Sequence, residues 1–423
     1  MNKTEIFEDV VAVMREDAAC CKDRKGGNAA EFRARITDDM TDEAFLFAMK
    51  SYLATFDLTG HLSIQKKEFG ILPFFVQRYE DALYVIENCE KSALSVGDKI
   101  IEVDGCPVKE YVEQHKEFLH GETEERQGAF WTRELLPFAG TLTYEDGKTG
   151  EKKSWKVTRI KNEDWIENVN YVCKDLGNKV TYVKLLDFNN QEEIEKMFAD
   201  NAGLLEQTTY LIVDVRANKG GTDTAFLPLL KYCLPDGETI SILEQEDDYG
   251  MEINYSRRNC ELRKKNFEEI LNGNIGEETR GLLEKMAAEL DEKSGQGFCV
   301  VEDDGEELPI VGDSAIQKVY ILTDENCGSS GDAFVLYFGR MPKVTVIGRP
   351  TMGILDYSNC SRVDYGEYVL LYPTSRLLAL DHGIVMMKKG VPVDEYIPWT
   401  PESLERDVEL EKALDLIAGE QNR

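Results

Sequence analysis

The sequence lacks several features that define whole classes of protein. Its 423 residues contain no apolar run that approaches the roughly 20 residues needed to span a bilayer. Lys and Arg total 49 against 80 Asp and Glu, which gives a formal charge of −31. A field of that sign repels phosphate backbones and anionic lipid headgroups. We therefore expect no membrane span, no binding to a membrane surface and no binding to nucleic acid.

Metal-site, disulfide and export signals are equally scarce. Only four His are present and no H-E-x-x-H motif occurs, so we predict no metal site and no other cofactor. The ten Cys include no C-x-x-C pair, which in so large a chain is typical of reduced, mostly buried thiols. The chain runs from Met1 into an acidic amphipathic stretch without the apolar core of a signal peptide. We expect a cytoplasmic protein, or a secreted one if a leader was trimmed.

What is present is an ordinary globular composition, with 42% hydrophobic residues and enough length for two or three domains. Up to about residue 65, apolar side chains recur at three- and four-residue intervals, as in Ile6, Val10 and Met14 and again around Met49. This spacing is typical of amphipathic helices. We predict an N-terminal helical module over residues 1–66.

The sequence pattern changes to short β-rich runs over residues 67–162. Residues 82–86 and 99–103 have the composition of strands, and the second runs into Asp104-Gly105, a strong turn dipeptide. A further strand pair is predicted near 140–144 and 154–157. These signals predict a compact β-rich domain of about the size of a PDZ domain.

From residue 163 to 423 buried-type strands alternate with helices, which indicates an α/β domain. Residues 209–215, 319–322 and 344–348 are short β-branched apolar runs suited to a sheet covered on both faces. A charged stretch near 257–295 has helical spacing and is predicted to be an insertion that covers or flanks the sheet.

Three short features carry the candidate chemistry. The strand at 209–215 runs into a turn with paired glycines, Gly220 and Gly221, where backbone N–H groups can approach a ligand closely. Ser329 precedes an apolar helix, where unpaired N–H groups favour developing negative charge. His61 follows the predicted N-terminal helices. Each feature also has an ordinary explanation, namely a tight turn, a helix N-cap and a surface histidine.

The order of these features resembles that of the carboxyl-terminal processing peptidase family, which includes the tricorn core. Members combine a helical N-terminal module, a PDZ domain and a crotonase-like (ClpP/crotonase-type) α/β core. The PDZ resemblance lies in residues 84–86 and in the run 92–105, with its sequence GDKIIEVDG. The core resemblance covers residues 182–188, 214–221, the Ser329 segment, 348–353 and 390–394. The resemblance implies an α/β serine peptidase.

The resemblance also implies roles for individual residues. Ser329 matches the family nucleophile, three residues before the acidic position that Asp332 occupies. The N–H of Ser330, together with that of Gly220 or Gly221, would form the oxyanion hole. Acyl transfer needs such a donor pair, because each donor changes the rate by about 10²–10³.

Two positions depart from the family pattern. The lysine of the bacterial Ser-Lys dyad is replaced by Ile354, which cannot accept a proton, so the dyad version is excluded. The tricorn-like branch instead uses a histidine before the PDZ domain, and His61 matches it. The glutamate that orients this histidine is replaced by Met387. The third group could be Asp356, for which a solvated turn acid is the simpler interpretation, or a backbone carbonyl.

The resulting hypothesis is a serine endopeptidase that hydrolyses peptide bonds through an acyl-enzyme on Ser329 with His61 as general base. The PDZ-like domain would hold a peptide or unfolded protein by strand addition or by its terminal carboxylate. The main alternative is an inactive family member that binds peptides or other ligands. A crotonase-type acyl-CoA enzyme is disfavoured, since no basic patch for CoA phosphates is evident.

The other histidines offer weaker candidates for the base. His382 follows Asp381, but neighbouring residues on a strand point to opposite faces, so Asp381 would orient it poorly. His115 and His120 fall in a polar part of the PDZ-like domain, where we expect them to be solvated.

Overall fold

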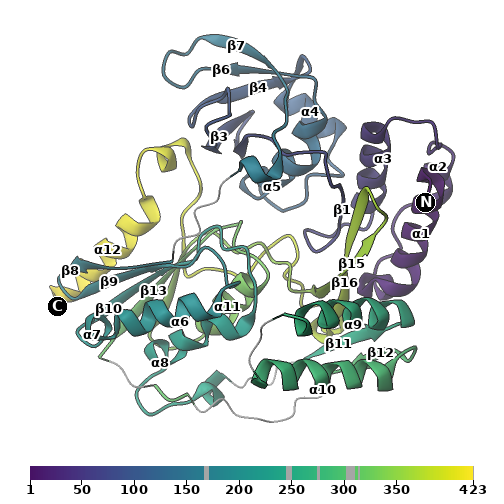
Figure 1. Ribbon diagram of the computed structural model, residues 1–423. Coiled ribbons are helices and arrows are strands. Elements are labelled where there is room, and N and C mark those ends of the chain that lie inside the picture. Colours follow the sequence, from purple (N-terminus) through teal and green to yellow (C-terminus); the bar gives the residue numbers. More distant parts are fainter. Residues whose placement is uncertain (166–170, 244–249, 274–276, 302–309, 313–314, 423) are drawn as a thin grey trace. The chain divides into compact units, whose positions relative to one another are not determined.

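The computed structural model describes residues 1–422 apart from 166–170, 244–249, 274–276, 302–309 and 313–314 (Figure 1). The chain forms two compact units, each assembled from three separate segments. The first unit comprises Met1–Phe69, Asp247–Asp304 and Asp356–Val385, and the second comprises Gly70–Glu246, Gly305–Leu355 and Met386–Arg423. The three domain ranges expected from the sequence follow the chain in order and stay a prediction.

The first unit combines helices with one antiparallel sheet. The sheet order is β1-β16-β11-β12, with β15 also paired to β16. Its strands are β1 (Ser63–Lys66), β11 (Met251–Tyr255), β12 (Gly297–Val300), β15 (Tyr357–Asp364) and β16 (Tyr368–Leu377). Its helices and helical turns are α1 (Lys3–Ala12), η1 (Val13–Asp17), η2 (Ala19–Lys22), α2 (Ala29–Arg33), α3 (Asp42–Ala54), α9 (Arg257–Leu271), α10 (Glu277–Lys293) and η9 (Leu378–His382).

The helices expected at the N-terminus are confirmed. Helix α1 begins at Asn2, whose side chain accepts the Glu5 N–H while the Glu5 carboxylate accepts the Asn2 N–H, a capping box. Its apolar positions are buried, as the spacing predicts, and α3 begins at the Thr41 N-cap. The charged helical stretch expected near 257–295 forms α9 and α10, with residues 274–276 outside the described part of the chain.

The second unit begins with a β-rich part, residues 70–164, which we call the PDZ-like part. Its sheet has the order β2-β3-β4-β6-β7, with β5 paired to β4. The elements are β2 (Phe74–Tyr79), β3 (Ala82–Asn88), β4 (Lys99–Val103), β5 (Cys106–Pro107), α4 (Val108–Gln114), η3 (Glu124–Gln127), α5 (Gly128–Phe130), η4 (Trp131–Leu135), η5 (Leu136–Phe138), β6 (Thr141–Glu145), β7 (Lys152–Lys156) and η6 (Asn162–Asp164). The predicted strands are all present.

The rest of the second unit is an α/β core around a sheet of order β17-β14-β13-β10-β9-β8. Strands β9, β10, β13, β14 and β17 are parallel, and β8 runs antiparallel to β9. The strands are β8 (Val172–Gly177), β9 (Val180–Lys184), β10 (Tyr210–Asp214), β13 (Lys318–Thr323), β14 (Val344–Gly348) and β17 (Glu395–Tyr396). The helical elements are α6 (Gln191–Asp200), α7 (Ala202–Leu205), η7 (Asp223–Leu229), α8 (Leu230–Cys233), η8 (Ile240–Leu243), α11 (Ser330–Phe338), η10 (Pro401–Leu404) and α12 (Val408–Gln421).

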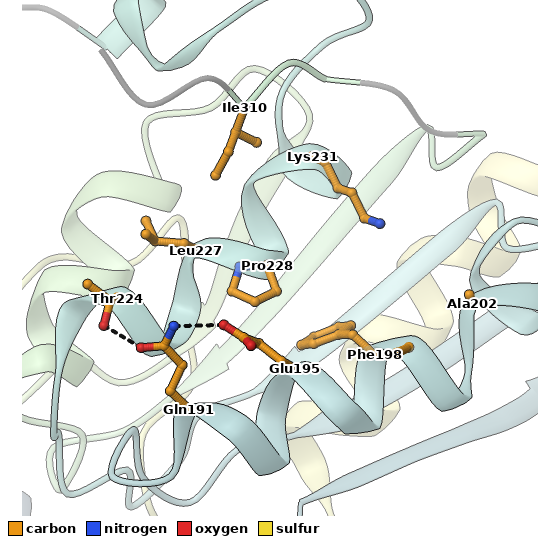
Figure 2. A pocket seen from close by; sticks show the side chains of 10 residues that line it. Gln191, Glu195, Phe198, Ala202, Thr224, Leu227, Pro228, Lys231 and Ile310 are labelled. Atoms are coloured by element: carbon orange, nitrogen blue, oxygen red, sulfur yellow. Dashed lines mark hydrogen bonds between the residues drawn. The ribbon is translucent and has the colours of Figure 1, made fainter. Parts of the chain in front are cut away.

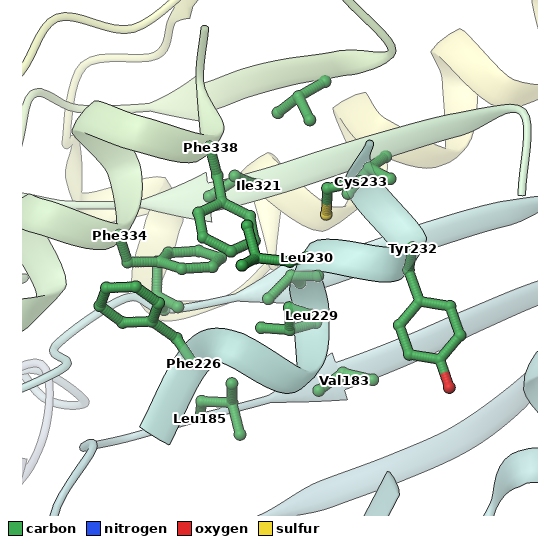
Figure 3. Packing of buried hydrophobic residues seen from close by; sticks show 14 of the residues in the cluster. Val183, Leu185, Phe226, Leu229, Leu230, Tyr232, Cys233, Ile321, Phe334 and Phe338 are labelled. Atoms are coloured by element: carbon green, nitrogen blue, oxygen red, sulfur yellow. The ribbon is translucent and has the colours of Figure 1, made fainter. Parts of the chain in front are cut away.

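Helices cover both faces of the parallel sheet, which explains why its strands are continuously apolar. On one face the side chains of β9, β10 and β13 pack against α6, η7, α8 and α11, as Figure 3 shows for Phe226, Phe334 and Phe338. On the other face they pack against α12. The expected α/β class is therefore confirmed. Among the described residues no helix has both the length and the apolarity needed to cross a membrane.

Replacing Phe334 should destabilise the second unit strongly. Its side chain is fully buried, and its ring lies 4.4 Å from that of Phe338 and 5.8 Å from those of Phe188 and Phe226. We expect Phe334→Ala to lower the free energy of unfolding by about 3–5 kcal/mol, measured by urea denaturation. Leu414→Ala is the control, because Leu414 is exposed, and should change it by less than about 1 kcal/mol. Equal effects of the two substitutions would contradict this packing.

Candidate active site

The candidate nucleophile lies at the carboxyl edge of the parallel sheet. Strands β10 and β13 are neighbours, so the segments that follow them, 215–221 and 324–329, meet at that edge. The Gly328 N–H donates to the carbonyl oxygen of Asn218 at 2.9 Å, which joins the two segments directly. The structure thus brings together Ser329, Ser330, Gly220 and Gly221, as the sequence predicts.

Ser329 has a strained backbone. Its φ of 59° and ψ of −122° lie outside the regions that non-glycine residues usually occupy. The conformation is held by Asp332, whose Oδ2 accepts the Ser329 N–H at 2.8 Å. Strain of this kind occurs at active sites when the surroundings fix it.

Gly220 lies directly against the candidate nucleophile. A Cβ atom at this position would stand 2.6 Å from Ser329 Cβ and 2.9 Å from the Gly328 carbonyl oxygen. Its φ of 77° also favours glycine. The first glycine of the pair is therefore needed for the close approach of the turn to Ser329.

Two backbone N–H groups remain available to an oxyanion. The Phe188 N–H donates to the Gly220 carbonyl oxygen and the Phe188 carbonyl oxygen accepts the Thr222 N–H, so the polar groups of Gly221 point away from Phe188. Within the described part of the chain neither the Gly221 N–H nor the Ser330 N–H has an acceptor. The Gly220 N–H already donates to Asn218 Oδ1 at 2.8 Å. Of the two glycines predicted as alternatives, Gly221 is thus the available donor.

Asp332 also holds the segment that contains Ile354, the residue at the position of the family lysine. Its carboxylate accepts the Gly353 N–H at 2.6 Å and the Ile354 N–H at 3.0 Å. Burial raises the pKa of Asp332, whereas the Thr351 hydroxyl and three backbone N–H groups oppose that rise by hydrogen bonding. Ile354 supplies only an apolar side chain beside Gly328.

His61 belongs to the first unit, where a main-chain carbonyl fixes its imidazole. Nδ1 lies 2.6 Å from the carbonyl oxygen of Tyr357, the first residue of β15. A carbonyl oxygen only accepts hydrogen bonds, so Nδ1 carries a proton in this contact. In the neutral ring Nε2 then has the lone pair, which is the tautomer that a general base needs.

Asp356 does not have the solvated position that was the simpler alternative. It is only 2% exposed, and its carbonyl oxygen accepts the Leu377 N–H at 3.0 Å. It belongs to the first unit together with His61 and directly precedes Tyr357. Met387, at the position of the family glutamate, is buried in the second unit.

Two expectations about the other histidines are wrong. Asp381 and His382 lie in the 3₁₀ turn η9 and not on a strand, and Asp381 instead pairs with the Arg376 guanidinium at 2.8 Å. His115 and His120 are not simply solvated. His115 is half-buried at the end of α4, with its ring 4.3 Å from that of Tyr111 in the same helix, and His120 is buried with its ring 5.2 Å from that of Phe130.

A separate hollow of about 440 Å³ lies over α6, η7 and α8. Figure 2 shows Phe198, Leu227 and Pro228 among its lining residues, together with Glu195 and Lys231. None of the predicted site residues lines it. In the part of the chain that the structure describes, no cluster of His, Cys, Asp or Glu is arranged to hold a metal ion.

The comparison with protein families decides the assignment. The model of peptidase family S41 matches residues 179–397, which is more than half of the chain. The chain belongs to peptidase family S41. A PDZ domain model matches residues 68–170. Membership confirms the resemblance seen in the sequence and makes the chain a serine-type peptidase.

Comparison with solved structures finds similar chains at low sequence identity. Mature CPAF complexed with lactacystin has 13% identity and a TM-score of 0.64, over 98% of this chain and 97% of that one. The photosystem II D1 C-terminal processing protease has 15% identity and a TM-score of 0.45, over 95% and 94% of the two chains. The tricorn protease also has 15% identity and a TM-score of 0.45, over all of this chain and 37% of that one. A search of curated proteins finds no match.

Two residues of the S41 site have structural roles that the sequence did not reveal. The fully buried Asn218 donates from Nδ2 to the Leu185 carbonyl oxygen at 2.9 Å and accepts the Gly220 N–H. Asp324 Oδ1 accepts the Ala217 N–H at 2.8 Å and the Asn326 N–H at 3.0 Å, which ties the glycine turn to the serine segment. The only local signal was their place shortly after buried strands, Asp324 directly after β13 and Asn218 four residues after β10.

The pH dependence of the chain's stability should reveal the raised pKa of Asp324. Burial, with the neighbouring charge of Glu325, raises the pKa of Asp324 to about 6 from its ordinary value of 3.8. A raised pKa means that the folded chain binds this proton more tightly than the unfolded chain, so the stabilisation is present at low pH and is lost as pH rises through 6. From about pH 5 to about pH 7, the free energy of unfolding should fall by about 1 kcal/mol more in the wild type than in Asp324→Asn. Parallel urea-denaturation profiles would contradict this.

Proposed function

We propose that the chain is an endopeptidase of the carboxyl-terminal processing type that cleaves peptide bonds through an acyl-enzyme on Ser329, with His61 as general base. The observation that carries the proposal is the arrangement around Ser329. A strained serine at a helix N-terminus lies beside two backbone N–H groups, of Gly221 and Ser330, that have no acceptor among the described residues. Such donors stabilise the charge that develops on a carbonyl oxygen during acyl transfer.

The proposed reaction has two halves. The His61 Nε2 takes the Ser329 hydroxyl proton as the Ser329 oxygen attacks the scissile carbonyl carbon. The resulting oxyanion accepts hydrogen bonds from the N–H groups of Gly221 and Ser330. The C–N bond then breaks, and the imidazolium gives its proton to the leaving amine. In the second half His61 takes a proton from a water molecule as the water oxygen attacks the acyl carbon. The ester bond to Ser329 then breaks, the imidazolium returns its proton to the Ser329 oxygen, and the new carboxylate leaves.

The Tyr357 carbonyl supports His61 in this role. Its hydrogen bond fixes the tautomer and the orientation of the ring, the tasks that a carboxylate performs in a Ser-His-Asp triad. We propose that this carbonyl, and not the Asp356 side chain, directly orients the imidazole. The mechanism requires the imidazole of His61, in the first unit, to come within hydrogen-bond reach of the hydroxyl of Ser329, in the second unit.

A second function is a peptide-binding S41 member without activity. Ile354 and Met387 favour it, because they replace the family lysine and glutamate with side chains that cannot exchange protons. The strain held at Ser329 and the tautomer of His61 favour the enzyme, since a binding protein needs neither.

A fluorophosphonate probe tests the assignment, because it reacts with activated serine hydroxyls. We expect wild-type labelling, none in Ser329→Ala, and a rate about 10²–10⁴ lower in His61→Gln, since the base is lost. His382→Gln is the matched control and should label at the wild-type rate.

Labelling that survives Ser329→Ala would overturn the nucleophile. An undiminished rate in His61→Gln, with loss in His382→Gln, would transfer the role of base to His382. A wild-type chain that is never labelled and hydrolyses no unfolded protein substrate would favour the inactive peptide-binding function.

A further inference from the structure

Strand β2 is the place where a peptide could add to the PDZ-like part. It is the terminal strand of its sheet and pairs only with β3 among the described strands. PDZ domains bind extended peptides by adding them as a strand to such an edge, where main-chain hydrogen bonds give the affinity.

This edge is occupied by the chain's own residues 124–135, which we call the edge segment. The Val76 N–H of β2 donates to the Thr132 hydroxyl at 3.2 Å, in place of a peptide carbonyl. A Cβ atom on Gly128 would lie 2.6 Å from the Val76 carbonyl oxygen. The helical turn therefore touches the β2 backbone, and no further strand fits between them.

Side chains of β2 hold the edge segment in place. The Gln77 Nε2 donates to the Glu125 carbonyl oxygen. The buried Arg78 guanidinium donates to Gln127 Oε1 and Glu124 Oε1, both at 2.8 Å. These side-chain contacts fasten residues 124–127 to β2.

The closed edge is nevertheless incompletely satisfied. Gln77 Oε1 is buried beside Gly128 and has no hydrogen-bond donor within the described part of the chain. A buried acceptor without a donor is unfavourable, and a peptide N–H could supply one. The closed state is thus one that a suitable ligand could displace.

The edge segment also contacts the catalytic core. The Arg126 guanidinium donates to three successive carbonyl oxygens, those of Pro350 at 3.0 Å, Thr351 at 2.6 Å and Met352 at 2.9 Å. The next two residues donate their N–H groups to Asp332, which holds Ser329. Arg126 therefore restrains the segment that supports the nucleophile.

We propose that the edge segment is an internal ligand of the PDZ-like part, so that a peptide can add to β2 only by displacing it and loosening the Arg126 contacts. Strand addition at this edge and the closed arrangement beside Asp332 are then mutually exclusive. Arg126 is a positioning residue for Ser329. Only this consequence for activity rests on the proposed peptidase function.

The binding test uses Ser329→Ala protein and a fluorescein-labelled extended peptide of ten residues with an apolar C-terminus and a free carboxylate. Gly128→Leu should bind it at least about tenfold more tightly by fluorescence anisotropy, because the side chain forces the edge segment off β2. Thr132→Val, of nearly the same shape, should bind it a few-fold more tightly, because it frees the Val76 N–H.

The matched controls are Gly203→Leu, whose added side chain meets open space, and Thr149→Val in the turn between β6 and β7. Both should bind as the parent protein does. Equal affinities of the parent, Gly128→Leu and Thr132→Val would overturn the proposal, and Thr132→Val keeps the test valid if Gly128→Leu does not fold.

The activity test compares Arg126→Met with Arg126→Lys in protein that retains Ser329. Arg126→Met should lower the fluorophosphonate labelling rate and kcat about tenfold with KM unchanged, and Arg126→Lys should recover part of the loss. An unchanged kcat in Arg126→Met would remove the positioning role. A wild-type chain without labelling would overturn the peptidase function while the binding result stands by itself.

Discussion

The arrangement of the second unit around its candidate nucleophile depends on one buried carboxylate. Asp332 is fully buried, and it accepts the N–H groups of Ser329, Gly353 and Ile354. A buried charge is tolerated only when it is well hydrogen-bonded. The carboxylate therefore fixes the segment that contains Ser329 and the segment that contains Gly353 and Ile354. This holds Ser329 in a backbone conformation that it would otherwise leave.

The elements of the site could be predicted because their signals are local. A buried strand followed by paired glycines, and a serine before an apolar helix, identify the two segments that meet at the sheet edge. The contacts between them could not be predicted, since Asn218 and Gly328 are far apart in the sequence and meet only because β10 and β13 are neighbours. Arg126 was missed for the same reason, as its carbonyl partners lie more than 220 residues away.

Errors occurred where a local pattern was compatible with two structures. The residues around Asp381 look like the end of a strand, yet the chain forms the 3₁₀ turn η9 there, and Asp381 pairs with Arg376. The sequence around Asp356 is compatible with an acid in a solvated turn, but Asp356 is buried directly before the start of β15. The partner of His61 is a carbonyl oxygen, which every residue carries, so no residue type could have indicated it.

The central claim is that the Ser329 hydroxyl becomes acylated. The most direct measurement is rapid acid quenching of the wild-type protein during turnover of an activated p-nitrophenyl ester, followed by mass mapping of the fragments. The account predicts an initial burst of nitrophenol and one acyl group on the fragment that contains Ser329. The absence of a burst, or an acyl group on any other fragment, would contradict it.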